Sequence, residues 1–156
     1  MKLVIRFVLH LLWATITLVL SAEAMADMRI STASNPSWKA ECSSCHLAYP
    51  PSLLPADAWR AMMAGLGQHF GVDASIDTKT AAEIGAFLQK NAGRSQGKAG
   101  LPNLRITESV WFKHEHDEVS AAVWRKPQVK TPSNCAACHR GAQQGNFDEH
   151  DVRLPR

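Results

Sequence analysis

The sequence of 156 residues contains 17 Lys and Arg against 14 Asp and Glu, and it has four cysteines. This length predicts a single domain once the N-terminal segment described below is removed. The charge is nearly balanced and no block of Lys or Arg stands out, which excludes a protein that binds nucleic acid through a strongly basic surface.

Residues 1–26 have the organisation of a secretory signal peptide. Lys2 and Arg6 supply positive charge, residues 7–20 are almost wholly apolar, and Ala24 and Ala26 place small side chains at a cleavage site. An uncleaved anchor helix is the alternative, but the apolar run has about 14 residues, fewer than the roughly 20 that span a bilayer. We therefore predict cleavage after Ala26, export to the periplasm and a mature domain of residues 27–156.

The mature chain is predicted to be mainly helical and loop-rich, with little or no β-sheet. Residues 27–40 are polar and predicted irregular, with a turn at 35–37, and the proline-rich segment 49–55 is a connector. Apolar residues at helical spacing predict helices over 56–70, 78–91 and 107–124, the second capped by Asp77. No segment has the sustained alternation of a half-buried strand.

Residues 93–103 are rich in glycine and polar side chains, which predicts a linker. This linker divides the mature chain into a first half, residues 27–99, and a second half, residues 100–156. Each half combines one Cys-x-x-Cys pair with one long predicted helix. The pair precedes its helix in the first half and follows it in the second, so the halves are not a sequence repeat.

All four cysteines belong to two copies of Cys-x-x-Cys-His, at residues 42–46 and 135–139. This is the attachment sequence of c-type haem. Two cysteines three positions apart lie on one side of a helical turn, so both can form thioethers with the haem vinyl groups, and the adjacent histidine then lies beneath the iron. The predicted attachment residues are Cys42, Cys45, Cys135 and Cys138, and the predicted proximal ligands are His46 and His139.

Other uses of paired cysteines remain as alternatives. A thioredoxin-like redox pair needs a βαβ context, which is not visible here. Two Cys pairs can also form a zinc ribbon, and an exported chain with an even number of cysteines can form disulfides. Because 89 residues separate the pairs and both carry the same trailing histidine, haem is favoured.

The ligand on the other side of each iron decides between electron transfer and an open site for ligand binding or catalysis. The remaining histidines of the mature chain are His69, His114, His116 and His150. His69 flanks the apolar stripe of the first long helix, and His116 shares a stripe with Phe112 on the third. We predict these two as distal ligands, with His114 as the fallback for His116 and with His150 at the surface.

The two Cys motifs stand within a longer pattern that covers nearly all of residues 38–155. Its parts are Glu-Cys-Ser-Ser-Cys-His at 41–46, Tyr-Pro-Pro-Ser-Leu-Leu-Pro at 49–55, Trp59, Gln-His-Phe-Gly at 68–71, Leu-Arg-Ile-Thr at 104–107, Trp-Phe at 111–112 followed by His116, Asn-Cys-Ala-Ala-Cys-His at 134–139 and Gly-Asn-Phe at 145–147. This pattern resembles the small dihaem cytochrome c family of exported bacterial electron carriers.

The resemblance implies a small, loop-rich cytochrome c-type fold around two covalently bound haem c groups, with His69 and His116 completing bis-histidine ligation. It implies electron transfer between redox proteins, with a small monohaem cytochrome or a membrane-bound donor as partner. Neither enzymatic activity, nor nucleic acid, nor a small-molecule substrate is expected. The alternatives are a dihaem peroxidase-like enzyme and a gas-binding haem protein, each of which needs one open iron. Which distal histidine serves which haem is left open.

Overall fold

The computed structural model describes residues 30, 33–94 and 103–156. In chain order, the helices and 3-10 turns of these residues are α2 (Pro36–Cys42), η1 (Pro51–Leu53), α3 (Ala56–Ala64), η2 (Leu66–Gln68), α4 (Thr78–Lys90), η3 (Ile106–Glu108), α5 (Val110–Glu115), α6 (Ala121–Trp124), η4 (Cys135–Ala137), η5 (Ala142–Gln144) and η6 (Glu149–Asp151). The described residues contain isolated β-bridges but no sheet. The prediction of a mainly helical, loop-rich fold is confirmed.

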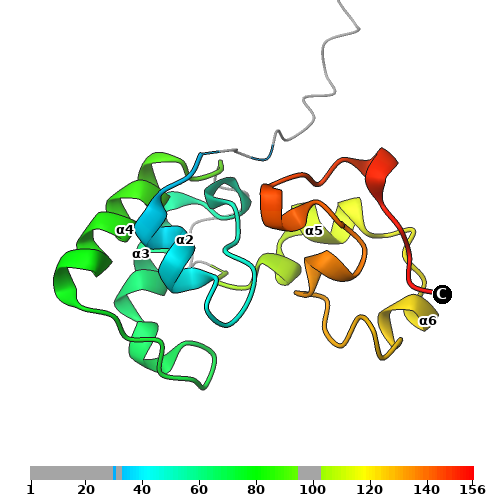
Figure 1. Ribbon diagram of the computed structural model, residues 1–156, viewed down its shortest axis with the longest axis horizontal. Helices are drawn as coiled ribbons and strands as arrows, with labels where there is room; N and C mark the ends of the chain where they lie inside the picture. Colours follow the sequence, from blue (N-terminus) through cyan, green and yellow to red (C-terminus); the bar gives the residue numbers. More distant parts are fainter. Residues whose placement is uncertain (1–29, 31–32, 95–102) are drawn as a thin grey trace, which may run out of the picture.

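Helices α2 and α3 of the first half both pack against α4 (Figure 1). Ile84 and Leu88 of α4 are almost completely buried, and they form one hydrophobic core with Trp38 of α2 and Trp59 of α3. Burial of side chains of this size contributes about 1.5 to 3 kcal/mol each. The first half therefore has a protein core of its own.

Helix α4 agrees with the helix predicted over 78–91. Asp77 is its N-cap, and the Asp77 side chain accepts a hydrogen bond from the Thr80 backbone N–H at 3.0 Å. Such a cap satisfies one of the backbone donors that a helix start leaves unpaired. The helix stops at the cap residue Asn91, as predicted.

Helix α2 contradicts the prediction that residues 27–40 are irregular with a turn at 35–37. Asn35 caps the helix, because its side-chain oxygen accepts a hydrogen bond from the Trp38 N–H at 2.8 Å. The Asn35 amide also donates to Glu83 of α4 at 2.8 Å, and Trp38 is buried. Asn-Pro is a turn signal and also a helix-start signal, and the burial of Trp38 decides between them.

The helix predicted over 56–70 is too long, because α3 ends before Gly65. A 3-10 turn, η2, follows, and His69 caps its C-terminal end. The next two residues have left-handed backbones, with φ of 51° at Phe70 and 95° at Gly71. Phe70 is 48% exposed and so does not continue the buried stripe of the helix. Glycine near the end of a helical pattern lowers helix propensity enough to end it here.

The single helix predicted over 107–124 is wrong, since the structure has two short helices, α5 and α6, with a break between them. Ser109 caps α5, and its hydroxyl oxygen accepts a hydrogen bond from the Phe112 N–H at 3.0 Å. The helix ends at His116, and Ser120 precedes α6 with an extended backbone. Serine is favoured at helix starts and disfavoured in helix interiors. The spacing of apolar residues carries no information about this preference, so it did not predict the break.

The backbone at Gly93, which follows α4, pairs with the segment that leads into α3. Its N–H donates to the Leu54 carbonyl at 2.9 Å, and it forms a parallel bridge with Pro55. A Cβ at this position would lie 2.1 Å from the Ser52 carbonyl oxygen. Only glycine allows the two backbones to approach so closely.

Several sequence predictions lie outside the described residues. They are the signal peptide over 1–26, its cleavage site, most of the linker over 93–103 and the boundary between residues 99 and 100.

Leu104 and Ile106, at the start of the described second half, pack against the core of the first. Among the described helices, none has the length and apolar character needed to cross a membrane.

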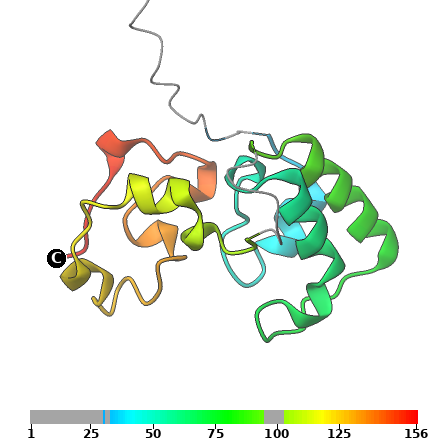
Figure 2. The ribbon, with the colours of Figure 1, turned by 180° about the vertical axis from the view of Figure 1, so that it is seen from behind.

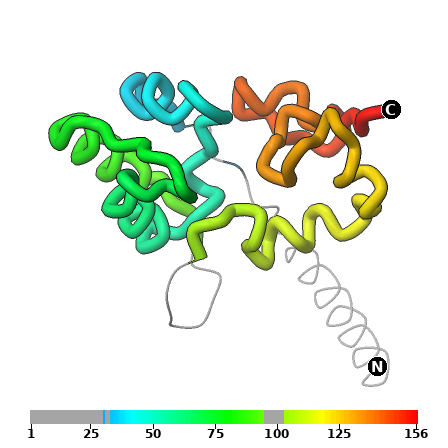
Figure 3. The backbone as a smooth tube through the Cα atoms, turned by 90° about the horizontal axis from the view of Figure 1, so that it is seen from below, coloured from blue at the N-terminus to red at the C-terminus, as the bar shows by residue number. Residues whose placement is uncertain are grey.

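The two halves lie side by side, with α2 to α4 on one side and α5, α6 and the C-terminus on the other (Figure 1). The view from behind shows the same division (Figure 2). From below, α2 lies next to the segment near η5 (Figure 3), and residues of both line one shallow pocket. The Tyr49 hydroxyl joins the halves directly, since it donates to the Ser133 carbonyl at 2.8 Å.

Candidate functional site

Each motif histidine faces a second histidine across a gap. The ring centroids are 6.0 Å apart for His46 and His69, and 6.1 Å apart for His139 and His116. Two imidazoles that bind opposite sides of one metal ion, with metal–nitrogen bonds of about 2 Å, have centroids roughly 6 to 6.5 Å apart. Both pairs therefore have the spacing that fits a single metal ion between the rings.

The first motif is presented by the end of α2. Cys42 is the last residue of this helix, and the chain continues in a turn towards His46. The His46 ring stacks on Tyr49 with centroids 4.9 Å apart, and its Nδ1 lies 2.7 Å from the Leu47 carbonyl oxygen. When Nδ1 donates its proton to a carbonyl, Nε2 keeps the lone pair with which imidazole binds a metal.

The second motif forms the short turn η4. The N–H groups of Cys138 and His139 both donate to the Cys135 carbonyl, at 3.2 and 2.8 Å. The His139 ring packs 5.4 Å from the Phe147 ring, while its Nδ1 is buried without a hydrogen-bond partner among the described residues. A helical turn thus carries both cysteines, as the attachment chemistry requires.

The two partner histidines come from different local structures. His116 ends α5, its Nδ1 donates to the Phe112 carbonyl at 2.9 Å, and its ring stacks on the Phe112 ring at 4.1 Å. His69 follows η2, with its ring 4.9 Å from Phe70 and its Nδ1 buried without a partner in the described structure. Unpaired buried polar atoms are rare in proteins. His69 and His139, which belong to different pairs, thus each have a nitrogen without a partner, unlike His46 and His116.

The half-buried histidines His69 and His139 are suited to bind a metal at neutral pH. The pKa of His69 is lowered, first by burial and then by the nearby charge of His46. The pKa of His139 is lowered by burial and then by His116. Both effects favour the neutral imidazole, which is the form that coordinates metals.

Three of the cysteine thiols have a raised pKa. Burial, with a smaller contribution from Glu41, raises the pKa of Cys42 to about 11. Burial also raises the pKa of Cys135 to about 11 and raises that of Cys138. The four cysteines form no disulfide with one another. Since disulfide exchange needs a thiolate, these environments do not fit a thioredoxin-like redox pair.

The two cysteine pairs do not gather at one centre. They lie in different halves of the molecule, and no group of three or more candidate metal-binding side chains occurs among the described residues. The arrangement does not resemble the four-ligand cluster of a zinc ribbon.

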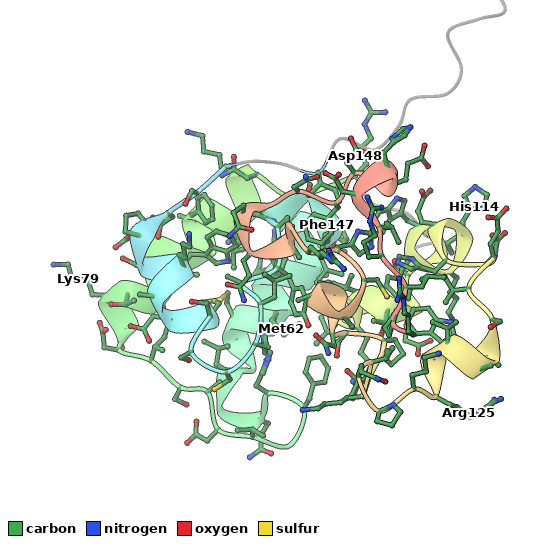
Figure 4. The ribbon with its side chains drawn as sticks, turned by 45° about the vertical axis from the view of Figure 1, so that its right-hand side comes forward. Met62, Lys79, His114, Arg125, Phe147 and Asp148 are labelled. Carbon is green, nitrogen blue, oxygen red and sulfur yellow. The ribbon has the colours of Figure 1, made fainter. Side chains whose placement is uncertain are left out.

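His114 and His150 lie away from both pairs. His114 is exposed on α5, and in Figure 4 it points outwards. His150 is 84% exposed, and its ring is 2.8 Å from the Asp148 carboxylate. The geometry thus favours His116 over His114 as the partner of His139, although the ligand roles stay predictions.

Sequence reasoning gave no role to three aromatic side chains around the histidine pairs. They are Tyr49 against His46, Phe147 against His139, and Trp124, whose ring is 5.9 Å from that of His116. Tyr49 and Phe147 stand just after the two motifs, a position that could have suggested a contact. The carbonyls of Leu47 and Phe112 have no sequence signature, because every residue carries one.

Replacing Tyr49 with phenylalanine is expected to lower the free energy of unfolding by about 1 kcal/mol, because it removes the hydroxyl that bonds to Ser133 and keeps the ring on His46. Urea unfolding of the haem-loaded protein measures the loss. Ser133→Ala is the matched control, since it keeps the backbone carbonyl that accepts from Tyr49 and removes only the exposed hydrogen bond between the Ser133 and Thr131 hydroxyls, so we expect a smaller loss. Equal stability of Tyr49→Phe and the wild type would show that this bond between the halves contributes nothing.

The comparisons with known proteins agree with this geometry. The family model described as dihaem cytochrome c matches residues 38–147. A dihaem cytochrome c from Shewanella baltica OS155 has a similar structure, with 42% identity and a TM-score of 0.69, over 78% of this chain and 93% of that one. A dihaem cytochrome c from Rhodobacter sphaeroides is similar at 44% identity and a TM-score of 0.67, over 73% of this chain and 97% of that one.

A second structure from Rhodobacter sphaeroides shows 47% identity and a TM-score of 0.65, over 74% of this chain and 98% of that one. No match was found among curated proteins. The family match spans more than half of the chain and includes both cysteine pairs. The chain belongs to the dihaem cytochrome c family and carries two c-type haems.

Proposed function

We propose that this protein is an electron carrier in which each haem iron is held between two histidines. His46 and His69 hold the first haem, and His139 and His116 hold the second. The observation that carries this proposal is the pair of ring separations, 6.0 and 6.1 Å, in two unrelated local structures. Each separation fits one metal ion with an imidazole on either side.

Closed coordination of both irons favours electron transfer over catalysis. A haem supplies a reversible one-electron centre, and the chain determines what else can reach the iron. When protein ligands fill both axial positions, substrates and peroxide find no free site. Two imidazoles also favour a lower reduction potential than the combination of histidine and methionine.

The periplasm is the proposed location, and redox proteins are the proposed partners. The signal-like residues 1–26 support export, and c-type haem is attached outside the cytoplasm. A small monohaem cytochrome or a membrane-bound donor is the class of partner that fits a carrier with two haems. No enzymatic activity is proposed, since a peroxidase-like or gas-binding protein needs an iron with one free position.

The test is the absorption spectrum of the isolated protein with both haems attached. We expect two low-spin haems per chain, uptake of two electrons per chain on reduction, and no rapid reaction with carbon monoxide. A high-spin haem in the isolated protein, or carbon monoxide binding at a rate proportional to its concentration, would show that one iron is open. Either result would reject the proposed function in favour of an enzyme or a gas-binding protein.

Removal of haem is expected to affect the two halves unequally. The buried hydrophobic residues of the second half are only Phe112, Val129 and Ala142 within the part that the structure describes, whereas the first half has the core around Ile84 and Leu88. A haem therefore supplies more of the second core. In residues 27–156 produced without haem attachment, we expect hydrogen exchange to show near-complete loss of protection in α5 and α6 and retained protection in α4. Similar protection in both halves would contradict this.

A further inference from the structure

The four facing histidines are not held equally well. His46 and His139 each directly follow a haem-attachment cysteine, which tethers them through a neighbouring residue. His116 has no such tether, but its Nδ1 donates to a carbonyl at 2.9 Å and its ring stacks on Phe112 at 4.1 Å. His69 has no such tether, its Nδ1 is buried without a hydrogen-bond partner in the described structure, and its closest aromatic contact is the tilted Phe70 ring at 4.9 Å. His139 also lacks a partner at Nδ1, but its neighbouring cysteine tethers it. Hydrogen bonds of this kind orient a metal-binding histidine and strengthen its bond to the metal.

The backbone of the turn that carries His69 has hydrogen bonds of unequal length. The His69 N–H donates to the Leu66 carbonyl at 3.3 Å, which is long, whereas Val72 donates to the His69 carbonyl at 3.1 Å and Ala74 donates to the Leu66 carbonyl at 2.9 Å. Phe70 adopts a left-handed φ of 51°, which costs conformational energy for any residue other than glycine.

The turn that carries His69 has open space on its outer side. A Cβ built on Gly71 would have no atom within 4 Å, and the side chains of Phe70 and Val72 are 48% and 63% exposed. His116, in contrast, lies between the rings of Phe112 and Trp124. Movement of His69 away from His46 therefore meets fewer obstacles than movement of His116 away from His139.

We propose that His69 is the exchangeable ligand of the first haem, and that a small uncharged diatomic molecule such as carbon monoxide or nitric oxide binds the iron in its place. This inference rests on the proposed bis-histidine ligation. One iron–nitrogen bond breaks and one bond to the incoming molecule forms. His69 leaves as a neutral imidazole, and no electron is transferred. The second haem stays closed because His116 is held in position.

The test is the reaction of the fully reduced, haem-loaded protein with carbon monoxide, followed by absorption. We expect a slow phase whose amplitude corresponds to one of the two haems. Its rate is set by dissociation of His69, so it stays constant as the carbon monoxide concentration rises. Loss of the hydrogen bond that orients a metal-binding histidine weakens metal binding by roughly 10–100-fold. Since His116 has this bond and His69 does not, the second haem is expected to react at least about tenfold more slowly than the first.

Three variants assign the slow phase. In His69→Ala the first haem is expected to react rapidly, with the slow phase gone. In His116→Ala a rapid phase from the second haem is added and the slow phase remains. The surface substitution His114→Ala is the control and should leave the slow phase unchanged. If an alanine variant does not fold, His69→Gly and His116→Gly, isolated with imidazole in the ligand position and then desalted, give the same comparison.

Two results would overturn the inference and leave the proposed function intact. One is a slow phase that survives in His69→Ala and is lost in His116→Ala, which would make His116 the exchangeable ligand. The other is a wild-type protein that binds no carbon monoxide at either haem. Rapid binding to the wild type, at a rate proportional to carbon monoxide concentration, would instead reject the proposed bis-histidine ligation itself.

Discussion

Replacement of His116 with alanine is expected to open one iron and leave the other closed. About half of the haem absorbance of the oxidised protein should change from the low-spin to the high-spin form, because only one of the two haems loses its second histidine. The aromatic rings of Phe112 and Trp124 beside His116 offer no atom that binds iron, so no neighbour can take its place. The absorption spectrum and the haem content per chain, measured together, check this expectation.

His114→Ala is the matched control for this experiment. His114 lies only two residues away, but its side chain is exposed and points away from the molecule (Figure 4). We expect both haems of this variant to remain low-spin. If His114→Ala produced the high-spin haem and His116→Ala did not, the pairing of His116 with His139 would be wrong, and the fallback ligand predicted from the sequence would be right.

Replacement of Gly93 with alanine is expected to lower the free energy of unfolding by about 3 kcal/mol, the upper end of the usual effect of an added methyl group in a packed region. The new Cβ would lie 2.1 Å from the Ser52 carbonyl oxygen and 3.0 Å from its carbon. Both are backbone atoms and cannot rotate away. The Gly93 hydrogen bond to Leu54 must therefore lengthen or break, and with it the contact that fixes the start of α3.

Gly85→Ala is the matched control, because Gly85 is also buried in the first half. The nearest atoms to a Cβ there are the Gln89 Nε2 and the Met63 Cγ, both at 3.9 Å, which is ordinary contact distance. Since Gly85 lies inside α4, alanine is expected to stabilise the protein by about 0.5 to 1 kcal/mol through its higher helix propensity. Urea unfolding of both variants measures the difference. A Gly93→Ala protein as stable as the wild type would show that the backbones at Ser52 and Gly93 can separate at little cost.

The two halves differ in the size of their hydrophobic cores and in how firmly the histidines proposed as second iron ligands are held. The first half has a core of its own, yet the histidine proposed as its second iron ligand, His69, is on a turn with a left-handed backbone at Phe70. The second half has few buried residues among those described, yet the histidine proposed as its second ligand, His116, is fixed by a hydrogen bond and a stacked ring. The number of buried residues in a half therefore does not predict how firmly that half holds its proposed iron ligand.

Local signals predicted the parts of the fold that depend on nearby residues. The cap at Asp77 and the apolar spacing of α4 were enough to place that helix within one residue of its observed end. The same periodicity failed at Gly65 and between His116 and Ser120, because glycine and serine end helices for reasons that apolar spacing does not record. Helix α2 was missed because its stability depends on the burial of Trp38 and on a bond from Asn35 to the distant Glu83.

The sequence by itself determined the chemistry of this protein, since two Cys-x-x-Cys-His motifs specify two covalently attached haems through residues that are adjacent in the chain. It could also restrict the candidates for the other iron ligands to a few histidines. Only the tertiary structure decided which of them face each other, because His46 and His69, and likewise His116 and His139, are brought together by packing between segments more than 20 residues apart. The unequal restraint of His69 and His116 was likewise invisible in the sequence, because it depends on a backbone carbonyl and on open space beside a turn.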